Sequence, residues 1–254
     1  GHRTPAGRLF HGGEWRSETE WPLERTQFTP FYIKTIDNGA GSLSTDLPPQ
    51  TGGRTTYLFN PANPVPSIGG GVSSLTDLTP MPGGLTDVSR APRSIRVRDV
   101  MSPGGFNQVE SPNVYGCSEP YLPLGSRPDV LVFETEPLEQ AVEVTGPIEV
   151  KIWVSSNAPD TDFTAKLIDV YPPSPWYPSG YALNLTDSIM RLRYRNGAES
   201  PDFPEPGEVS EITITLYPTS NLFARGHRIR LDISSSNFPR FDVNPNTGEP
   251  IGKD

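Results

Sequence analysis

Residues 212–216 read ITITL and residues 229–233 read IRLDI, so apolar and polar side chains alternate strictly in both stretches. This alternation is the pattern of a β-strand that buries one face and exposes the other. Residues 130–133 are continuously apolar and indicate a central strand that is covered on both faces. Other strand-like stretches lie at 28–33, 55–59, 95–100, 148–154, 164–170 and 188–195. The sequence therefore predicts an all-β protein.

One of these stretches carries three arginines at alternate positions. Arg191, Arg193 and Arg195 would share one face of a strand at 188–195, while Met190 and Leu192 would lie on the other face. Because successive side chains of a strand point to opposite faces, we expect the three arginines to be solvated together.

Long connections separate the strands and shape the predicted architecture. The cluster PPSP at 172–175 is one of several proline-bearing turns, and such connections favour a two-layer jelly-roll β-sandwich over a meander of tight hairpins. Residues 61–128 are dominated by proline, glycine and serine, and we expect an irregular loop insertion at about 71–125. We assign residues 7–254 to one domain with this insertion, and residues 1–6 to a linker or a cloning remnant.

Composition excludes several classes of protein. The chain has 254 residues, of which 30 are proline, and this much proline argues against a mostly helical fold. The net charge of -9 argues against nucleic acid or an anionic membrane as a partner. The single cysteine, Cys117, forms no internal disulfide and excludes a cysteine-rich zinc site. Since no apolar run is long enough to span a membrane, we expect a soluble protein that is either cytoplasmic or secreted.

The motifs that could carry catalysis are weak. The nearest matches to the G-x-S-x-G turn of serine hydrolases, at 71–75 and 116–120, lack the second glycine and do not lie between a strand and a helix. His227 would need a nucleophile and an orienting acid to act as a base, so packing at a strand end is the simpler interpretation. Asp160 and Asp162 supply few of the oxygens that calcium requires, and they suit a turn. We therefore expect no catalytic residue, no metal and no cofactor in this chain.

Two aromatic residues keep a binding function open. Trp176 and Tyr177 lie in a proline-rich loop and are the best candidates for a ligand platform on which a sugar ring could stack, although they also suit the pinning of that loop. An autonomous carbohydrate-binding β-sandwich is thus an alternative function, and a structural module that dimerises through a sheet edge is a further one. Asn184 begins an N-x-T glycosylation sequon, which matters only in a secreted protein.

Five stretches resemble one protein family. They are EWRSETEWP at 14–22, NPANPVPSIGG at 60–70, DVLVF at 129–133, VSSNAPDTDF at 154–163 and SSSNFPRFD at 234–242. Together they resemble the C-terminal domain of the cocaine esterase and X-Pro dipeptidyl peptidase family of serine hydrolases, to which α-amino-acid ester hydrolases and glutaryl acylases are similar. The matching stretches occur in order along the chain.

The resemblance implies a jelly-roll sandwich of the galactose-binding-like type that follows an α/β-hydrolase domain in the same polypeptide. It implies that the Ser-His-Asp triad belongs to that other domain, that this chain is a fragment without it, and that a further strand follows Asp254. The expected function is that of a non-catalytic domain of an ester- or amide-hydrolysing enzyme. It would pack on the catalytic domain and shape its substrate pocket or a homo-oligomer.

The chain departs from the family pattern after Gly70. In the family, residues near this point lie close to the substrate pocket, so the resemblance makes Ser73 and Ser74 the candidates for a pocket-facing loop. The stretch that follows, to about Gly125, is open to three interpretations: a lid, an oligomer contact or a surface loop.

Overall fold

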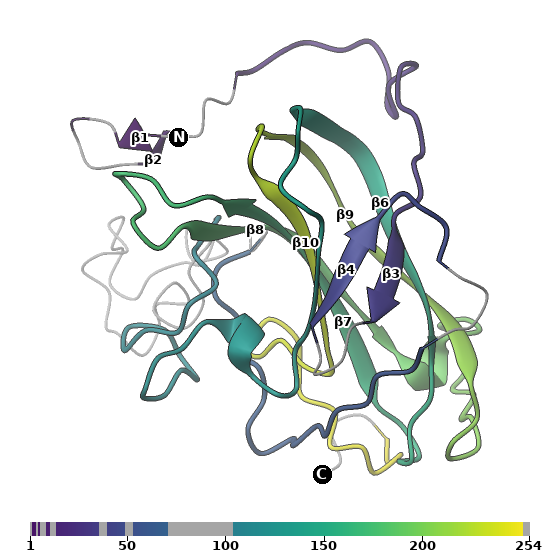
Figure 1. Ribbon diagram of the computed structural model, residues 1–254. Helices are drawn as coiled ribbons and strands as arrows, with labels where there is room; N and C mark the ends of the chain where they lie inside the picture. The colour runs from purple at the N-terminus through teal and green to yellow at the C-terminus, as the bar shows by residue number, and fades with distance from the viewer. Residues whose placement is uncertain are drawn as a thin grey trace, which may run out of the picture.

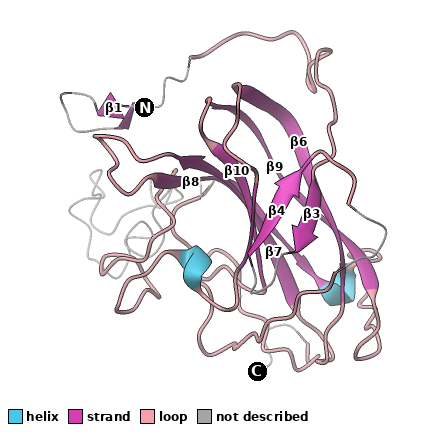
Figure 2. Ribbon diagram, in the orientation of Figure 1, coloured by secondary structure: helices cyan, strands magenta, loops and turns pink. Residues whose placement is uncertain are grey.

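The computed structural model describes residues 2–3, 5, 9–10, 14–35, 40–48, 53–70 and 104–250. Its largest sheet has six strands in the order β3-β4-β5-β10-β7-β8, and β6 pairs with β9 in a second layer. Figure 1 shows these strands surrounded by long loops, and Figure 2 shows how much of the described chain is loop. The described residues contain no α-helix.

The hydrogen-bonded strand pairs give the bounds of the strands. The six-stranded sheet contains β3 (Tyr32–Thr35), β4 (Ala40–Ser44), β5 (Leu131–Glu134), β10 (Arg228–Ser234), β7 (Asp162–Tyr171) and β8 (Tyr181–Arg191). The second layer contains β6 (Val142–Val154) and β9 (Ser210–Phe223). The remaining elements are the pair β1 (His2–Arg3) and β2 (Leu9–Phe10) and the short 3-10 turns η5 (Leu124–Ser126) and η6 (Leu192–Tyr194). All paired strands run antiparallel except β4 and β5, which are parallel.

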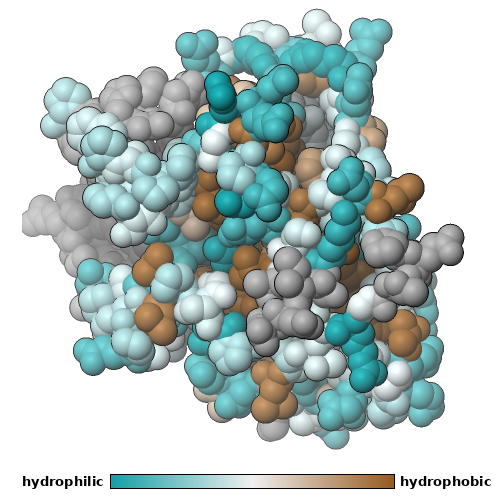
Figure 3. Space-filling view, in the orientation of Figure 1, coloured by the Kyte–Doolittle hydropathy of each residue, from teal (hydrophilic) through white to brown (hydrophobic). Residues whose placement is uncertain are grey.

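The apolar faces of the two layers meet in one core. Its fully buried side chains include Ile214 and Phe223 of β9, and they pack in one cluster with apolar residues of β7 and β10. The alternation of the sequence places Ile212, Ile214 and Leu216 there, because every second side chain in this part of β9 points toward the larger sheet. The register of β6 with β9 shifts between Gly146 and Ile148, and beyond this irregularity Phe223 returns to the core out of step with the alternation. On the face seen in Figure 3, the apolar groups that reach the surface are separated by hydrophilic residues. This confirms the predicted β-sandwich, while the jelly-roll connectivity and the boundaries at 7–254 stay predictions.

Three predicted strands of the N-terminal half have different outcomes. The candidate at 28–33 becomes β3, which begins at Tyr32 and lies at the edge of the sheet. Residues 55–59 belong to no ladder, and the Tyr57 hydroxyl bonds the Ser235 hydroxyl at 2.7 Å instead. The candidate at 95–100 lies outside the described residues.

The prediction of three solvated arginines on one strand is wrong. β8 ends at Arg191, and the chain then turns through η6, so the strict alternation of a strand no longer applies. Arg193 is buried, and its Nε donates to Asp160 Oδ2 at 2.7 Å. The buried carboxylate holds the guanidinium inside the protein, which the period of the sequence alone did not indicate.

A second expectation also fails, that of a wet outer face on β10. Arg230, Asp232 and Ser234 alternate with the core residues of β10, as predicted, but they are buried as well. The loops at 61–70 and 104–130 supply Val65, Ile68, Leu124 and Val130 to a second apolar cluster that also includes Val132 of β5. The six-stranded sheet is therefore covered on both faces, and its outer face keeps a buried polar layer.

Candidate functional site

The outer face of the six-stranded sheet carries a row of charged side chains. Lys166 of β7 lies in register between Asp187 of β8 and Asp232 of β10. All three side chains are buried. Opposite charges on neighbouring strands attract each other, but burial of a charged group is costly unless it has close partners.

Each carboxylate of this row has an arginine partner. Arg230 donates to Asp232 through Nε at 2.6 Å and through Nη2 at 2.9 Å, which is a bidentate contact. Asp187 Oδ1 forms an ion pair with Arg240 Nε at 2.7 Å, and Asp187 Oδ2 accepts a hydrogen bond from Asn237 Nδ2 at 2.8 Å. The two aspartates are thus matched by groups other than the lysine between them.

Lys166 donates instead to a neutral amide, because its Nζ lies 2.8 Å from Gln108 Oε1. No carboxylate of the described residues lies within ion-pair distance of this ammonium group. Burial lowers the pKa of Lys166, and the nearby charges of Asp187 and Asp232 act against this shift. The row therefore contains one cation whose closest partner is uncharged.

Gln108 joins the sheet to two separate loop segments. Its Nε2 donates to the carbonyl oxygen of Ile68 at 2.8 Å and to that of Phe106 at 3.1 Å. The Phe106 amide donates in turn to Asn184 Oδ1 at 2.7 Å. Asn184 is buried, so its sequon is not accessible in the folded domain. One buried glutamine thus fixes both segments against β7 and β8.

The two segments form a stem, which we define as residues 65–70 and 104–109. Gly70 and Gly104 exchange two main-chain hydrogen bonds, of 2.8 Å and 3.0 Å. Both glycines have positive φ angles, +130° and +106°, which side chains rarely allow. A Cβ atom at Gly70 would lie 3.4 Å from Asp187 Oδ2, so the stem approaches the charged row closely. The stem closes the base of segment 71–103.

The predicted pocket-facing residues follow directly after the stem. Ser73 and Ser74 lie outside the described residues. The structure places Gly70, three residues before Ser73, and shows that the main chain there is held by Gly104. That Ser73 and Ser74 face a substrate pocket stays a prediction.

The two residues of the predicted ligand platform have different surroundings. Trp176 is 53% exposed, whereas Tyr177 is 7% exposed and packs against Tyr171 and Tyr181, with ring centroids 6.3 Å and 4.7 Å away. Tyr177 therefore pins the proline-rich loop and does not present its ring to solvent. Any platform in this loop would depend on Trp176, and sugar binding stays a prediction.

His227 has an acid partner but belongs to a packed cluster. Its Nδ1 lies 2.8 Å from Asp169 Oδ1, and the other oxygen of Asp169 accepts a hydrogen bond from Asn221 Nδ2 at 3.2 Å. The imidazole packs on Tyr171 with ring centroids 4.2 Å apart. Within the described residues no serine hydroxyl bonds this histidine. This arrangement orients an imidazole directly before the start of β10.

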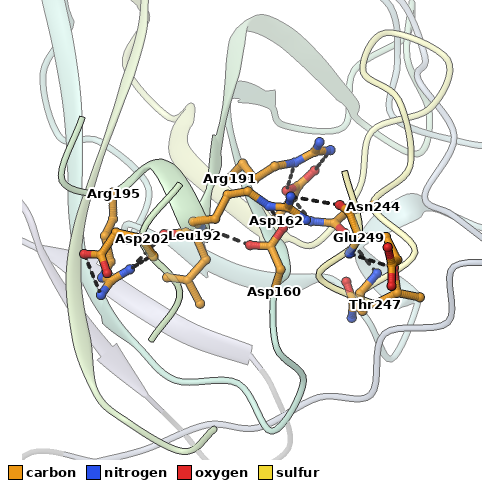
Figure 4. A network of polar contacts seen from close by, with 11 residues as sticks. Asp160, Asp162, Arg191, Leu192, Arg195, Asp202, Asn244, Thr247 and Glu249 are labelled. Carbon is orange, nitrogen blue, oxygen red and sulfur yellow. Dashed lines mark hydrogen bonds and ion pairs between the residues drawn. The ribbon is translucent and has the colours of Figure 1, made fainter. Parts of the chain in front are cut away.

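Asp160 and Asp162 bind arginine and asparagine side chains. Arg191 donates to Asp162 at 2.8 Å and 2.9 Å, and Arg193 donates to Asp160 through Nε at 2.7 Å. Asn244 Nδ2 donates to both carboxylates, at 2.8 Å and 2.9 Å (Figure 4). We call these five residues the clamp, because they tie the C-terminal segment to β7 and β8. In the part of the chain that is described, no group of three or more acidic, histidine or cysteine side chains is placed to hold a metal.

Sequence reasoning missed the residues that build the stem. In the sequence, Lys166 is one polar position of the predicted strand at 164–170, and Gln108 lies in a stretch without any recognised motif. The available signal was the polar content of β7 and β10, since lysine, arginine and aspartate on central strands need partners if those strands are buried.

The fold and the site together define a β-sandwich domain whose buried polar groups hold long loops in place. The chain belongs to the family of X-Pro dipeptidyl-peptidase C-terminal non-catalytic domains, whose pattern it matches over residues 2–253. Within the described residues, no helix has the length and apolar character of a membrane span.

Two curated proteins illustrate the relationship. The cocaine esterase of Rhodococcus sp. (strain MB1 Bresler) is 39% identical over 257 residues, which cover 98% of this chain and 37% of the esterase. A putative serine esterase of Mycobacterium bovis is 30% identical over 133 residues, which cover 46% of this chain and 20% of that protein. The chain thus spans little more than a third of the length of the cocaine esterase.

Two solved structures share the fold. An aminopeptidase from a marine sediment archaeon, Thaumarchaeota archaeon, superposes with a TM-score of 0.64 at 27% identity, over 98% of this chain and 34% of the aminopeptidase. An α-amino acid ester hydrolase superposes with a TM-score of 0.62 at 28% identity, over 87% of this chain and 31% of the hydrolase. These relatives are larger hydrolases in which the matched region is one part of the chain.

Proposed function

We propose that this domain packs on the α/β-hydrolase domain of an ester- or amide-hydrolysing enzyme. Its stem would present segment 71–103, including Ser73 and Ser74, to the substrate pocket of that domain. The observation that carries the proposal is the construction of the stem, in which Gln108 fixes both arms against the sheet. A loop that is anchored at both ends by buried polar contacts has a defined base, as binding loops on a rigid scaffold require.

The relatives support the chemistry of this proposal. Those named above are an esterase, an ester hydrolase and an aminopeptidase, which all hydrolyse an acyl bond to oxygen or nitrogen. All of them extend well beyond the matched region, so each has room for a separate catalytic domain.

The test is a chimera in which this chain replaces the matched C-terminal region of the Rhodococcus cocaine esterase. We expect the isolated chain to leave a p-nitrophenyl ester intact and the chimera to hydrolyse it. Gln108→Leu should raise the KM of the chimera with a smaller effect on kcat, because the loop would lose its fixed base. Gln140→Leu is the matched control, since Gln140 is exposed and lies outside the stem.

Two results would contradict the proposal. One is ester hydrolysis by the isolated chain that a serine-directed inhibitor abolishes. The other is an active chimera in which Gln108→Leu and Gln140→Leu have the same KM. A homo-oligomer stays a prediction, and sedimentation of the isolated chain and of the chimera tests it.

A carbohydrate-binding function rests on one observation, the exposed ring of Trp176. It predicts glycan-array binding that Trp176→Ala abolishes. A glycan signal that survives this substitution would exclude Trp176 as the platform.

A further inference from the structure

One segment of the molecule shows an inverted arrangement of polar and apolar side chains. We call residues 14–28 the strap. Trp15 is fully exposed, Phe28 is 73% exposed and Trp21 is 54% exposed. Leu23 is the buried apolar side chain of this segment. Three large aromatic rings therefore lie in solvent on a stretch that forms no regular ladder.

The polar side chains of the strap make its contacts with the sandwich. Arg16 bonds Glu143 of β6 and also lies 2.7 Å from Glu18, which accepts a hydrogen bond from Arg25. Thr26 Oγ1 donates to a main-chain carbonyl of β6 at 3.3 Å. Figure 1 shows the strap running beside β6 at the upper end of the molecule. Ion pairs and a main-chain contact thus set its position, and the aromatic rings are left on the outside.

This inversion indicates a covered surface in the working protein. An ordinary surface segment turns its large apolar side chains toward the core, since burial of a Trp or Phe ring is strongly favourable. Exposed tryptophans are also the residue type that dominates the binding energy of protein interfaces. The surrounding charges, Arg16, Glu18 and Arg25, would form the polar rim that such interfaces have.

The larger relatives indicate which partner this surface would meet. In the relatives the matched region is the C-terminal part, so their remaining length precedes the residues that align with the strap. A domain on that side is connected to the strap by a short path. Docking within one polypeptide needs few contacts, because the effective concentration of the partner is high.

We propose that the strap is the docking surface for the α/β-hydrolase domain, with Trp15, Trp21 and Phe28 as the buried anchors. This inference rests on the proposed function and adds the place of contact. The contact is apolar at its centre, the Arg16, Glu18 and Arg25 charges form its rim, and Arg16 ties the strap to Glu143 of β6.

The experiment is hydroxyl-radical footprinting, read by mass spectrometry, of the isolated chain and of the chimera with the cocaine esterase. In the isolated chain, Trp15, Trp21, Trp153 and Trp176 should all be oxidised, because all four are exposed. In the chimera we expect Trp15 and Trp21 to become at least about tenfold less reactive, while Trp176 keeps its reactivity. Trp176 is the matched control, since its exposure, 53%, equals that of Trp21 within one percent.

Substitutions give a second readout. Trp15→Ala with Trp21→Ala should shorten the half-life of chimera activity by about tenfold relative to Trp176→Ala, and should leave the melting temperature of the isolated chain unchanged. An active chimera with unprotected Trp15 and Trp21 would overturn the strap as the docking surface, and the proposed function would stand. An inactive chimera would overturn both.

Discussion

The molecule contains two buried charge networks that differ in how their charges are matched. In the clamp, every arginine meets a carboxylate directly, as Arg193 meets Asp160 and Arg191 meets Asp162. Beneath the stem, Lys166 donates to the neutral amide of Gln108, and no carboxylate in the described part of the chain pairs with it. The comparison separates two uses of buried polarity: the clamp holds a chain end with fully paired charges, whereas the stem network leaves one cation with a neutral partner.

The largest effect should come from breaking the clamp. Asp160→Ala removes the partner of the Arg193 guanidinium, of the Arg193 amide and of Asn244 at once. Loss of one member of a buried ion pair costs about 3–5 kcal/mol, because a charge is left buried without compensation. Chemical unfolding of the isolated chain should show this loss. The control is Asp202→Ala, whose carboxylate is half exposed and should cost less than about 1 kcal/mol.

Removal of the stem lysine should have a smaller effect. Lys166→Met keeps the bulk of the side chain, but leaves Gln108 Oε1 without its donor, which costs about 1–3 kcal/mol. The loss of a poorly compensated buried charge offsets part of this cost. Lys166→Met combined with Gln108→Leu should be less destabilised than the sum of the two single variants, because the two side chains act as a pair. Strict additivity in unfolding free energy would contradict the pairing.

The two networks also differ in what the sequence revealed of them. Alternation in β9 and β10 correctly predicted which side chains enter the core, because a strand has a period of two wherever it lies. It did not predict that Asp232 is buried, since this depends on loops that are remote in sequence. Gln108 lies 58 residues from Lys166, and Asn244 lies 84 residues from Asp160.

The alternating pattern at 188–195 likewise did not predict where β8 ends. Arg193 continues the alternation of β8 in sequence, yet η6 turns it toward Asp160. The ion pair with Asp160 compensates part of the desolvation cost of the buried guanidinium, and its geometry is not visible in the alternation of the strand. The candidate site could be located only to the neighbourhood of Gly70, through the resemblance, because its anchors come from three distant parts of the chain.

The pH dependence of stability should distinguish the lysine of the stem from the arginines of the clamp. Burial lowers the pKa of Lys166 in the folded chain below the ordinary value of 10.5. Between these two pKa values the unfolded chain binds a proton that the folded chain lacks, so stability rises with pH and levels off near 10.5. We expect the unfolding free energy of the natural chain, minus that of Lys166→Met, to increase as pH rises through this interval.

The opposite trend should appear above pH 10 in both proteins. Burial raises the pKa of Tyr57 from 10.0 to about 12, so the folded chain keeps a proton that the unfolded chain loses, and stability falls. This contribution cancels in the difference between the natural chain and Lys166→Met. A difference that stays flat from neutral pH to pH 10 would show that Lys166 titrates alike in the folded and unfolded chains.

The smallest effect concerns the approach of the stem to the charged row. Gly70→Ala should be destabilising by about 1–2 kcal/mol, since alanine is strained at a φ of +130°. Gly207→Ala has a comparable strain, at a φ of +88°, but a Cβ there would meet nothing within 4 Å, whereas at Gly70 it would lie 3.4 Å from Asp187 Oδ2. We therefore expect Gly70→Ala to be a few tenths of a kcal/mol worse in thermal unfolding, and to lose that excess when Asp187 is also replaced by Ala. Equal losses of unfolding free energy in the two glycine variants would mean that the approach of Gly70 to the Asp187 carboxylate does not affect stability. The position of the stem would then depend on Gln108.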